Sequence, residues 1–267
     1  MNILEDRRPR MSNPRLSCVP GFDKIGGKRN GETGMIDIHS HILHGVDDGA
    51  KDLAESVAMA RIAYEDGTRD IVVTPHFNGV YLVGTDTVLR KMEELQRELD
   101  RQEIAIRLHP GNEVRIESKT FVEEHMRSRS FSYLGAPAKF LLIEQRWQEY
   151  DDLTPEVFER LLHEGITPII PHPERHFFFR EEPETLLKLI ELGAWTQVSA
   201  DSLVGNFGTE AAQFGEWLCE TGNAHTLATD AHNVTRKPNL SDGMAIFAKL
   251  AGEDAKAALE ARTRRIL

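Results

Sequence analysis

The sequence predicts one α/β domain in which seven parallel strands alternate with helices and close into a barrel. Three observations lead to this prediction. A length of 267 residues is ordinary for a single α/β barrel. From residue 35 onward, short apolar runs rich in strand-forming residues alternate with amphipathic stretches. Side chains that can bind metals follow the ends of these runs, where the loops of such a barrel converge on one mouth.

Seven short apolar runs are expected to form the strands. In chain order they occupy residues 35–39, 70–74, 104–108, 140–144, 167–170, 195–199 and 225–229. The stretches between them carry apolar residues at helical spacing. They predict helices at residues 52–65, 86–101, 117–126, 155–164, 183–192 and 210–220, with a helical tail after the last strand.

Residues at the ends of these stretches support the helices. N-caps are expected at Asp52, Thr85 and Thr154, because each offers a side-chain oxygen to a free backbone N–H. Glycine tolerates the left-handed conformation that often closes a helix. The glycines expected to do so are Gly67, Gly165, Gly193 and Gly222.

The charge balance narrows the possible functions. The formal net charge is −11, and the basic residues are not concentrated in one place, which argues against a nucleic-acid partner. An acidic enzyme that acts on a phosphate needs metal ions to reverse the local charge. No apolar run approaches the roughly 20 residues that cross a bilayer, so no insertion into a membrane is expected.

Two further features concern the compartment and the N-terminal part of the chain. The only cysteines are Cys18 and Cys219, too few for a disulfide framework or a thiolate zinc site, and a cytoplasmic location is expected. Residues 1–34 are rich in Gly, Pro, Asn and Arg and lack a sustained periodicity. They are expected to form a flexible extension, and residues 35–267 the catalytic domain.

Histidines and carboxylates gather at the ends of the predicted strands. A single histidine there is usually a hydrogen-bonded core residue, but a whole series indicates a metal site. Imidazole and carboxylate suit Zn, Mn or Fe, and a carboxylate can bridge two ions. Residues two apart on a strand share a face, so the first two histidines can bind one ion. The series is His39, His41, His76, Glu113, Glu144, His172, Asp230 and His232.

Several segments resemble a known superfamily. They are the run from His39 through Asp47-Asp48-Gly, Thr-Pro-His76, His172-Pro-Glu-Arg and Asp230-Ala-His-Asn. Together they resemble the polymerase-and-histidinol-phosphatase (PHP) superfamily, and more narrowly its bacterial manganese-dependent protein tyrosine phosphatases of capsule and exopolysaccharide clusters. The segments at residues 46–49 and 202–208 are specific to that subgroup. The resemblance covers residue 35 to the C-terminus and implies a distorted seven-stranded (β/α) TIM-like barrel, the PHP fold.

The resemblance also implies three divalent ions, Mn²⁺ with Fe or Zn as alternatives. Each ion would have its own set of ligands, with one carboxylate bridging two of them. Asp47 competes with Asp48 as a ligand of the third ion. The implied sets are His39, His41 and Asp230 for the first ion, Glu113 bridging to a second completed by Glu144 and His172, and Asp48, His76 and His232 for the third.

Basic residues near these ligands are candidates for binding phosphate. Arg175 resembles the phosphate-binding arginine of the family, and its planar donor fork suits a phosphoryl group. The resemblance places a second basic residue directly before a proline. That position is Lys237, and Arg236 stands beside it, so both remain candidates. Asp48 or a histidine is a candidate general acid, and the sequence does not decide between them.

The function implied is hydrolysis of phosphotyrosine on a bacterial tyrosine kinase of capsular or exopolysaccharide synthesis. This is a phosphoric monoester hydrolase reaction, in which water activated by the ions attacks phosphorus. A cysteine nucleophile would require an arginine six positions later, but Lys24 follows Cys18 and His225 follows Cys219 at that spacing. The alternatives are another PHP phosphoesterase, such as a histidinol-phosphate phosphatase or a nuclease-like hydrolase, and a non-catalytic regulatory binder.

Overall fold

The computed structural model describes residues 34–135 and 139–267. The predicted extension at residues 1–34 lies outside this part of the chain, apart from Gly34, and so does Cys18. All strand pairs of the described residues are parallel and follow chain order, as predicted for an α/β fold. One sheet contains β1 (Met35–Ser40), β2 (Thr68–Val73) and β4 (Arg107–His109). The other contains β3 (His76–Phe77), β5 (Glu113–Arg115), β6 (Phe140–Glu144), β7 (Thr167–Pro171), β8 (Trp195–Ser199) and β9 (Thr226–Ala228).

The two sheets belong together because the second and third strand paths are each interrupted just after the predicted strand and then resume in the other sheet. The second path divides into β2 and β3 around Pro75, and the third divides into β4 and β5 around Pro110. Proline has no N–H to donate to a ladder, so the pairing stops there. Beyond the breaks, the Glu113 N–H donates to the Pro75 carbonyl oxygen at 3.2 Å, and pairing resumes.

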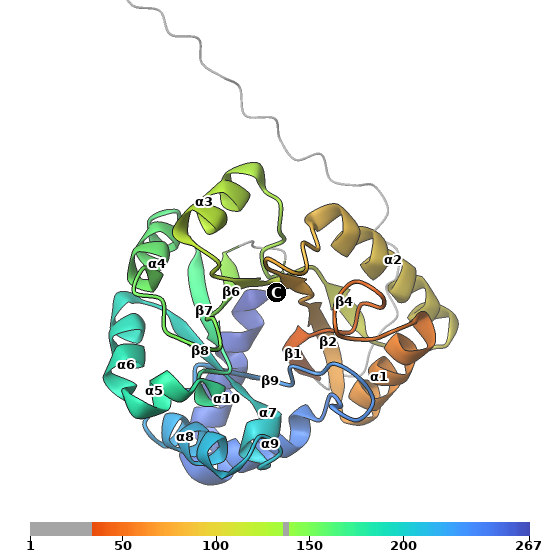
Figure 1. The fold of residues 1–267 in the computed structure, drawn as a ribbon. Coiled ribbons are helices and arrows are strands. Elements are labelled where there is room, and N and C mark those ends of the chain that lie inside the picture. Colours follow the sequence, from red (N-terminus) through yellow and green to blue (C-terminus); the bar gives the residue numbers. More distant parts are fainter. Residues whose placement is uncertain (1–33, 136–138) are drawn as a thin grey trace, which may run out of the picture. The chain divides into compact units, whose positions relative to one another are not determined.

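The far edges of the two sheets also meet. Ser40 forms a parallel bridge with Ala231, and the His41 N–H donates to the Ala231 carbonyl oxygen at 2.8 Å. Between the same two edges, the buried carboxylate of Asp37 accepts hydrogen bonds from the Thr229 N–H at 3.1 Å and from the Thr229 hydroxyl at 2.5 Å. The strands therefore form a distorted, barrel-like ring with helices around it (Figure 1).

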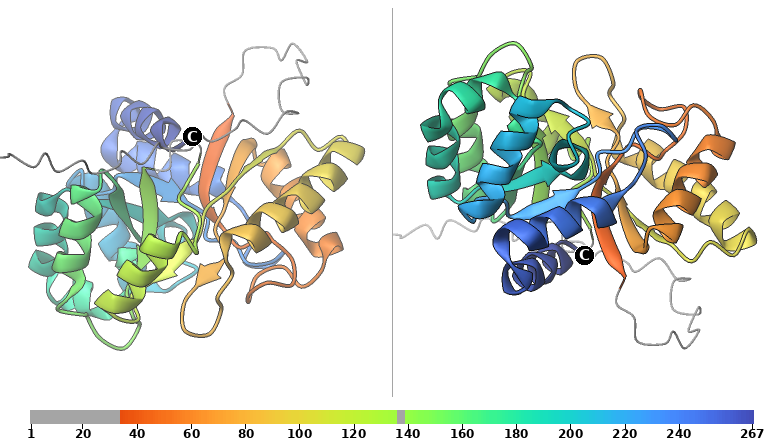
Figure 2. Two further views of the ribbon diagram at one scale, coloured as in Figure 1. Left: turned by 90° about the horizontal axis from the view of Figure 1, so that it is seen from above. Right: turned by 90° about the horizontal axis from the view of Figure 1, so that it is seen from below.

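The predicted helices are all present, and short ones occur between them. Figure 2 shows that they lie outside the strands when the molecule is seen from above and from below. The six predicted helices correspond to α1, α2, α3, α4, α6 and α8, and the helical tail is α9 and α10. Their bounds, with the unpredicted α5 and α7, are α1 (Leu53–Glu65), α2 (Thr85–Arg101), α3 (Lys119–Ser128), α4 (Thr154–His163), α5 (Phe177–Glu181), α6 (Pro183–Leu192), α7 (Ala200–Leu203), α8 (Thr209–Glu220), α9 (Leu240–Ala251) and α10 (Glu253–Thr263).

One of the three predicted N-caps is confirmed. Asp52 accepts from the Glu55 N–H at 2.9 Å, but the caps predicted at Thr85 and Thr154 are wrong, because both residues lie inside the first turn. The hydroxyl of Thr154 instead donates to the Gln145 side chain at 2.9 Å. The glycine prediction is confirmed, with positive φ angles of 102°, 78°, 116° and 75° at Gly67, Gly165, Gly193 and Gly222.

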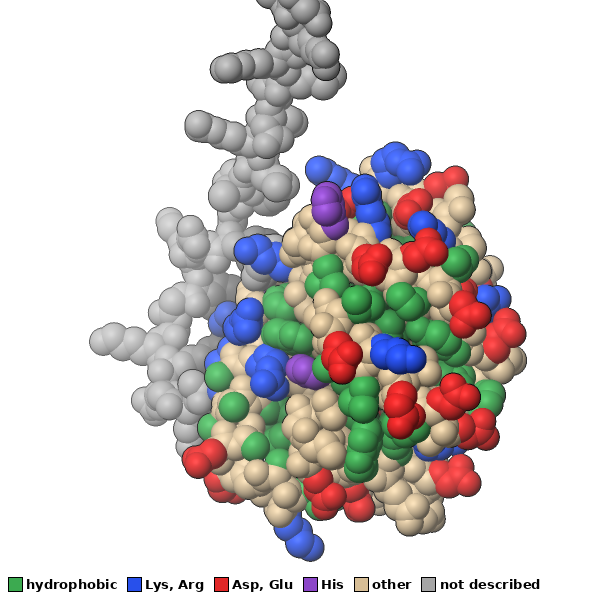
Figure 3. Space-filling model, turned by 90° about the vertical axis from the view of Figure 1, so that its left-hand side faces the viewer, with side chains coloured by type: hydrophobic (Ala, Val, Ile, Leu, Met, Phe, Trp, Pro, Cys, Tyr) green, Lys and Arg blue, Asp and Glu red, His purple; other side chains and the backbone are tan. Residues whose placement is uncertain are grey.

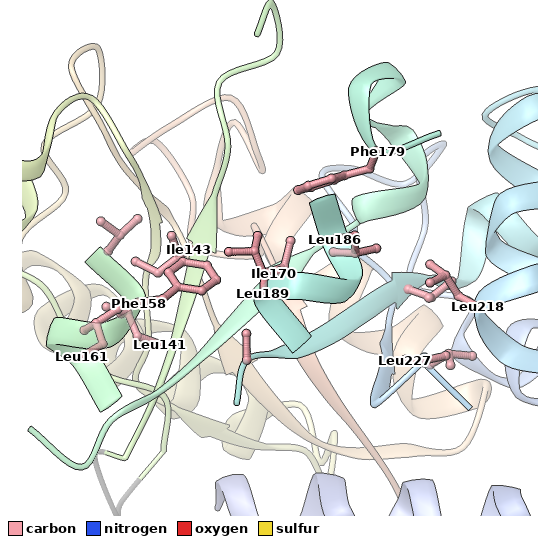
Figure 4. Packing of buried hydrophobic residues seen from close by; sticks show 14 of the residues in the cluster. Leu141, Ile143, Phe158, Leu161, Ile170, Phe179, Leu186, Leu189, Leu218 and Leu227 are labelled. Carbon is pink, nitrogen blue, oxygen red and sulfur yellow. The ribbon is translucent and has the colours of Figure 1, made fainter. Parts of the chain in front are cut away.

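Side-chain alternation along the strands separates the core from the site. Leu141 and Ile143 of β6 face outward and pack against Phe158 of α4 in the main apolar cluster (Figure 4). Leu142 points to the other side, into a smaller cluster inside the ring. Glu144 lies two residues later and shares that inward side, at the end of the strand. Packing of the apolar residues therefore directs a carboxylate into the mouth of the barrel.

The outer surface shows no sign of a dominant charged patch on the side of α4 and α6. Figure 3 shows acidic and basic side chains scattered among apolar ones on that face. In the described part of the chain, no helix combines the length and the apolar character needed to cross a membrane.

Candidate metal centre

The first two histidines at the end of β1 point their Nε2 atoms at each other. These atoms lie 3.2 Å apart. The other ring nitrogens face acceptors: His39 Nδ1 lies 2.8 Å from the side-chain oxygen of Gln197, and His41 Nδ1 lies 2.8 Å from the Asp47 carboxylate. Each Nδ1 therefore carries a proton and each Nε2 presents its lone pair to the other. Two lone pairs at this distance repel each other unless a proton or a metal ion lies between them.

Glu113, at the start of β5, is surrounded by histidines. Its Oε1 lies 3.1 Å from His172 Nε2 and 3.4 Å from His39 Nε2. Its Oε2 lies 2.9 Å from His76 Nδ1 and 3.4 Å from His41 Nε2. Burial alone would raise the pKa of this carboxyl, but the charges of His39 and His76 hold it well below its usual value. A carboxylate with two histidines at each oxygen is suited to bridging two ions.

A third group lies closer to the surface. Asp48 Oδ1 lies 3.3 Å from His76 Nε2 and 3.7 Å from His232 Nε2, and the Asp48 side chain is 52% exposed. Asp47 lies elsewhere: besides His41, it accepts from the backbone N–H of His76 and of Gly49, both at 3.0 Å. The geometry thus gives Asp48 the position of a ligand and Asp47 the position of a residue that orients His41.

All nine predicted ligands fall into sets whose donor atoms lie within 4.8 Å of one another. The sets overlap, as expected when ligands are shared between ions. These sets differ in part from the three ligand sets implied by the resemblance, because Glu144 groups with His76 and not with His172. The assignment of ligands to individual ions therefore stays a prediction. The sets are His41, Asp48, His76 and His232; His39, His172 and Asp230; His39, His41 and Glu113; and His76, Glu113 and Glu144.

The charges of these residues show a need for cations. Burial opposes a charge on His41, yet the neighbouring carboxylates, above all Asp47, raise its pKa well above the usual value. Burial also raises the pKa of Glu144 to about 8, with a further contribution from the charge of Glu113, and its Oε2 is buried without a hydrogen-bond partner. Without metal ions, His41 and Glu144 therefore hold protons near neutral pH, and bound cations would replace these protons. Its nitrogen and oxygen donors fit Mn²⁺, Fe²⁺ or Zn²⁺.

Two arginines border the cluster on one side. Arg175 donates to Asp230 Oδ2 at 2.6 Å, and Arg236 donates to the same oxygen. The ring of Phe207 lies against both guanidinium groups, with centroid distances of 4.1 Å and 5.2 Å. Arg236 lines the recess above the ligands, whereas Lys237 is exposed and does not. Of the two candidates for a second phosphate contact, the structure places Arg236 at the site.

Seven of the nine candidate ligands and both arginines line one recess of about 300 Å³, whereas His39 and His41 are fully buried and do not line it. Tyr81 and Trp147 form aromatic parts of its wall. Arg175 lies under the Trp147 ring, with 4.9 Å between guanidinium carbon and ring centroid. The recess therefore combines a metal-binding floor, donors for an anion and flat apolar faces.

Comparison with known proteins identifies the family. The model of the family described as capsular polysaccharide synthesis, CpsB/CapC, matches residues 35–265. The chain belongs to the CpsB/CapC family.

Relatives of this CpsB/CapC chain include named enzymes. The tyrosine-protein phosphatase YwqE of Bacillus subtilis is 37% identical over 222 residues, which are 82% of this chain and 86% of that protein. The tyrosine-protein phosphatase CpsB of Streptococcus pneumoniae is 28% identical over 82% of this chain and 91% of its own length. A crystal structure from work on these two proteins, described as unique metal-dependent tyrosine phosphatases, superposes with a TM-score of 0.83 at 36% identity, covering 87% of this chain and 94% of that one.

The fold extends beyond the family. The phosphotriesterase homology protein of Escherichia coli superposes with a TM-score of 0.58 at 12% identity, covering 88% of this chain and 99% of its own. At that identity the likeness concerns the fold alone, and it supports the predicted TIM-like barrel class.

Sequence reasoning missed the residues that shape the recess around the ligands. Gln197 orients His39, and its only signal was a polar residue inside an apolar strand run. Tyr81 and Trp147 lie in loops, where nothing in the sequence marked them. Phe207 belongs to the segment at residues 202–208 that was recognised as typical of the subgroup, but its contact with two arginines was not foreseen.

Gln197 provides a test of the metal centre that does not depend on activity. Gln197→Leu removes the acceptor for His39 Nδ1, and we expect affinity for Mn²⁺ to fall by about 10- to 100-fold, because outer hydrogen bonds fix the tautomer and direction of a ligating histidine. Metal-competition titration measures this affinity. Gln197→Glu keeps an acceptor and should retain tight binding. Equal affinity in the leucine variant and the unmodified protein would contradict a ligand role for His39.

Proposed function

We propose that this CpsB/CapC protein is a metal-dependent protein tyrosine phosphatase that hydrolyses phosphotyrosine. The observation that carries the proposal is that seven of the nine ligand side chains and two arginines line one recess with aromatic walls, and that the other two ligands, His39 and His41, belong to the same cluster. The arginines suit the phosphate group, and the aromatic walls suit the phenyl ring. The B. subtilis relative named as a tyrosine-protein phosphatase supports the same substrate class.

We propose Mn²⁺ as the ion, with Fe²⁺ or Zn²⁺ as alternatives, held by His39, His41, Asp48, His76, Glu113, Glu144, His172, Asp230 and His232. Divalent ions bound there would neutralise phosphate charge and lower the pKa of water, so that hydroxide is available near neutral pH. Other side chains of the protein orient these ligands. Gln197 and Asp47 hold the first two histidines in orientation, and the buried surroundings keep the ligands in place.

Arg175 and Arg236 would bind the phosphate oxygens. Both guanidinium groups reach the same oxygen of Asp230, so they converge on one point at the edge of the cluster. A phosphate placed beside that point would receive donors from both arginines as charge spreads over its equatorial oxygens. Contact with Phe207 and Trp147 restricts the rotation of Arg175, which lowers the entropy lost on binding.

Asp48 is better suited to binding a metal than to acting as a general acid. A hydrogen bond from His76 is the main reason that the pKa of Asp48 is below its usual value, so the group is ionised near neutral pH and has no proton to give. Tyrosine is a moderately acidic leaving group, and its phenolate needs little protonation. No residue is therefore assigned as a general acid.

The biological substrate that we propose is a bacterial tyrosine kinase acting in capsular or exopolysaccharide synthesis. The family description, capsular polysaccharide synthesis, supports this process. We place the reaction in the cytoplasm, because ATP, the phosphate donor of a tyrosine kinase, is found there.

Metal removal tests the proposed function directly. Treatment with a chelator should reduce phosphate release from a phosphotyrosine peptide by more than about a thousandfold, because the ions supply several kcal/mol of stabilisation to the transition state. Addition of Mn²⁺ should restore it, and Fe²⁺ and Zn²⁺ can be compared in the same assay. Full activity of protein shown by elemental analysis to be free of metal would contradict the proposal.

The same assay separates the alternatives. Histidinol phosphate and an oligonucleotide are compared with the phosphotyrosine peptide under identical metal conditions. We expect the peptide to have the highest kcat/KM. Preference for either other substrate would assign the protein to a different phosphoesterase class, and inactivity of the metal-loaded protein towards all three would favour a regulatory binder.

A further inference from the structure

Three consecutive phenylalanines follow the site arginine by two residues, and they have different environments. Phe179 is fully buried in the main apolar cluster. Phe178 packs against the Tyr150 ring at 5.9 Å between centroids. Phe177 is 41% exposed, so packing of the core does not account for a large aromatic side chain at this position. Its exposure calls for a functional explanation.

A groove leads from the recess to Phe177. Its first section, of about 470 Å³, shares Trp147 and Arg175 with the recess and continues past Phe207 to Arg180. The second section, of about 420 Å³, shares Arg180 and Glu210 with the first and is lined by Phe177, Phe214 and Trp217. The groove is therefore continuous with the proposed catalytic site and runs between α5 and α8.

The far section of the groove combines aromatic faces with polar side chains, among them Glu181 and Gln213. The charge of Arg180 is balanced within the chain, because it lies 3.2 Å from the Glu210 carboxylate and also donates to the Glu174 carbonyl oxygen at 3.1 Å. Beyond this pair, Phe177 and Trp217 supply broad apolar faces, and the Trp217 ring stacks on Phe214 at 5.1 Å. An apolar side chain of a ligand would match these aromatic faces.

Stacked rings hold the entrance to the groove in shape. The buried His176 ring stacks on Trp147 at 4.5 Å and on Phe178 at 5.0 Å. This series of contacts joins the wall of the recess to α5. A surface that is already ordered before binding loses little entropy when a ligand arrives.

We propose that the groove binds the substrate polypeptide on one side of the phosphotyrosine, with an aliphatic or aromatic side chain of the substrate against Phe177 and Trp217. This inference rests on the proposed function. A phosphotyrosine side chain occupies the recess only, so the polypeptide that carries it must pass over the rim. The groove is continuous with that rim at Trp147 and Arg175. Burial of one apolar side chain there is sufficient to change affinity about tenfold or more.

The test uses phosphotyrosine peptides built from glycine and serine, each with one leucine at a different distance from the phosphotyrosine. For the metal-loaded protein, we expect leucine at one or two neighbouring positions to lower KM about tenfold with little change in kcat. Phe177→Ser should abolish that preference, and it should not change kcat/KM for free phosphotyrosine.

Leu89→Ser is the matched control, because Leu89 is 44% exposed on α2, on the other side of the strands from α5 (Figure 1). It should leave the leucine preference unchanged. Equal KM values for all peptides, or a leucine preference that persists in Phe177→Ser, would contradict peptide binding in the groove. Neither result would contradict the proposed phosphatase activity. Inactivity towards free phosphotyrosine and every peptide would overturn the proposed function and the groove with it.

Discussion

Glu113→Gln is expected to lower kcat/KM for phosphotyrosine hydrolysis by at least about a thousandfold. The carboxylate contacts His39 and His172 through one oxygen and His41 and His76 through the other, so four potential ligands meet at this one side chain. The neutral amide keeps the size of the side chain but bridges cations poorly. The Lewis-acid stabilisation by metal ions amounts to several kcal/mol. Removing even part of it lowers kcat/KM by several powers of ten.

The measurement combines initial rates with elemental analysis of bound metal. The variant should bind fewer ions per chain than the unmodified protein and should retain its far-UV circular dichroism, because the change is isosteric. Glu156→Gln is the control, since this glutamate is 53% exposed on α4 and pairs with Lys119 away from the cluster. Near-normal turnover of Glu113→Gln with a full complement of ions would show that Glu113 does not bridge metals.

The order of elements could be predicted from the sequence because each element is defined by local patterns. The interruptions of the second and third strand paths could not be predicted, because they depend on which backbone groups of the adjacent strand lie opposite the prolines. The strand predicted at residues 104–108 is displaced for a related reason. The Ile104 N–H donates to the Leu99 carbonyl oxygen at 2.9 Å, so this residue belongs to the turn that follows α2, and β4 begins later, at Arg107. The third path then resumes as β5, which was not predicted.

The candidate ligands could be predicted because they follow strand ends, and strand ends in a barrel converge. Choices between adjacent residues could not be made in this way. Asp47 is directed towards His41 by bonds from Gly49 and from His76, which is 29 residues away. A contact across that distance is a property of the fold, and the sequence around Asp47 and Asp48 does not contain it. The same reason explains why Gln197, 158 residues from its partner His39, was missed.

Arg175→Ala is expected to lower kcat/KM for phosphotyrosine by about 100- to 1000-fold, the usual effect of removing one donor to a charged transition state. The guanidinium lies at the cluster edge, stacked between Phe207 and Trp147 and bonded to Asp230. Arg175→Lys restores the charge but neither the planar fork nor the stacking, so we expect only partial recovery. Steady-state kinetics with a phosphotyrosine peptide measures both effects.

Inhibition by inorganic phosphate distinguishes a contact with substrate from a structural role of Arg175. If the arginine binds the phosphoryl group, Arg175→Ala weakens phosphate inhibition along with turnover, while metal content remains unchanged. Lys237→Ala is the control, because that side chain is exposed outside the recess, and it should stay within about twofold of the unmodified protein. Unchanged phosphate inhibition in Arg175→Ala, with lost metal instead, would mean that Arg175 acts by holding Asp230 in position and that Arg236 is the principal phosphate contact.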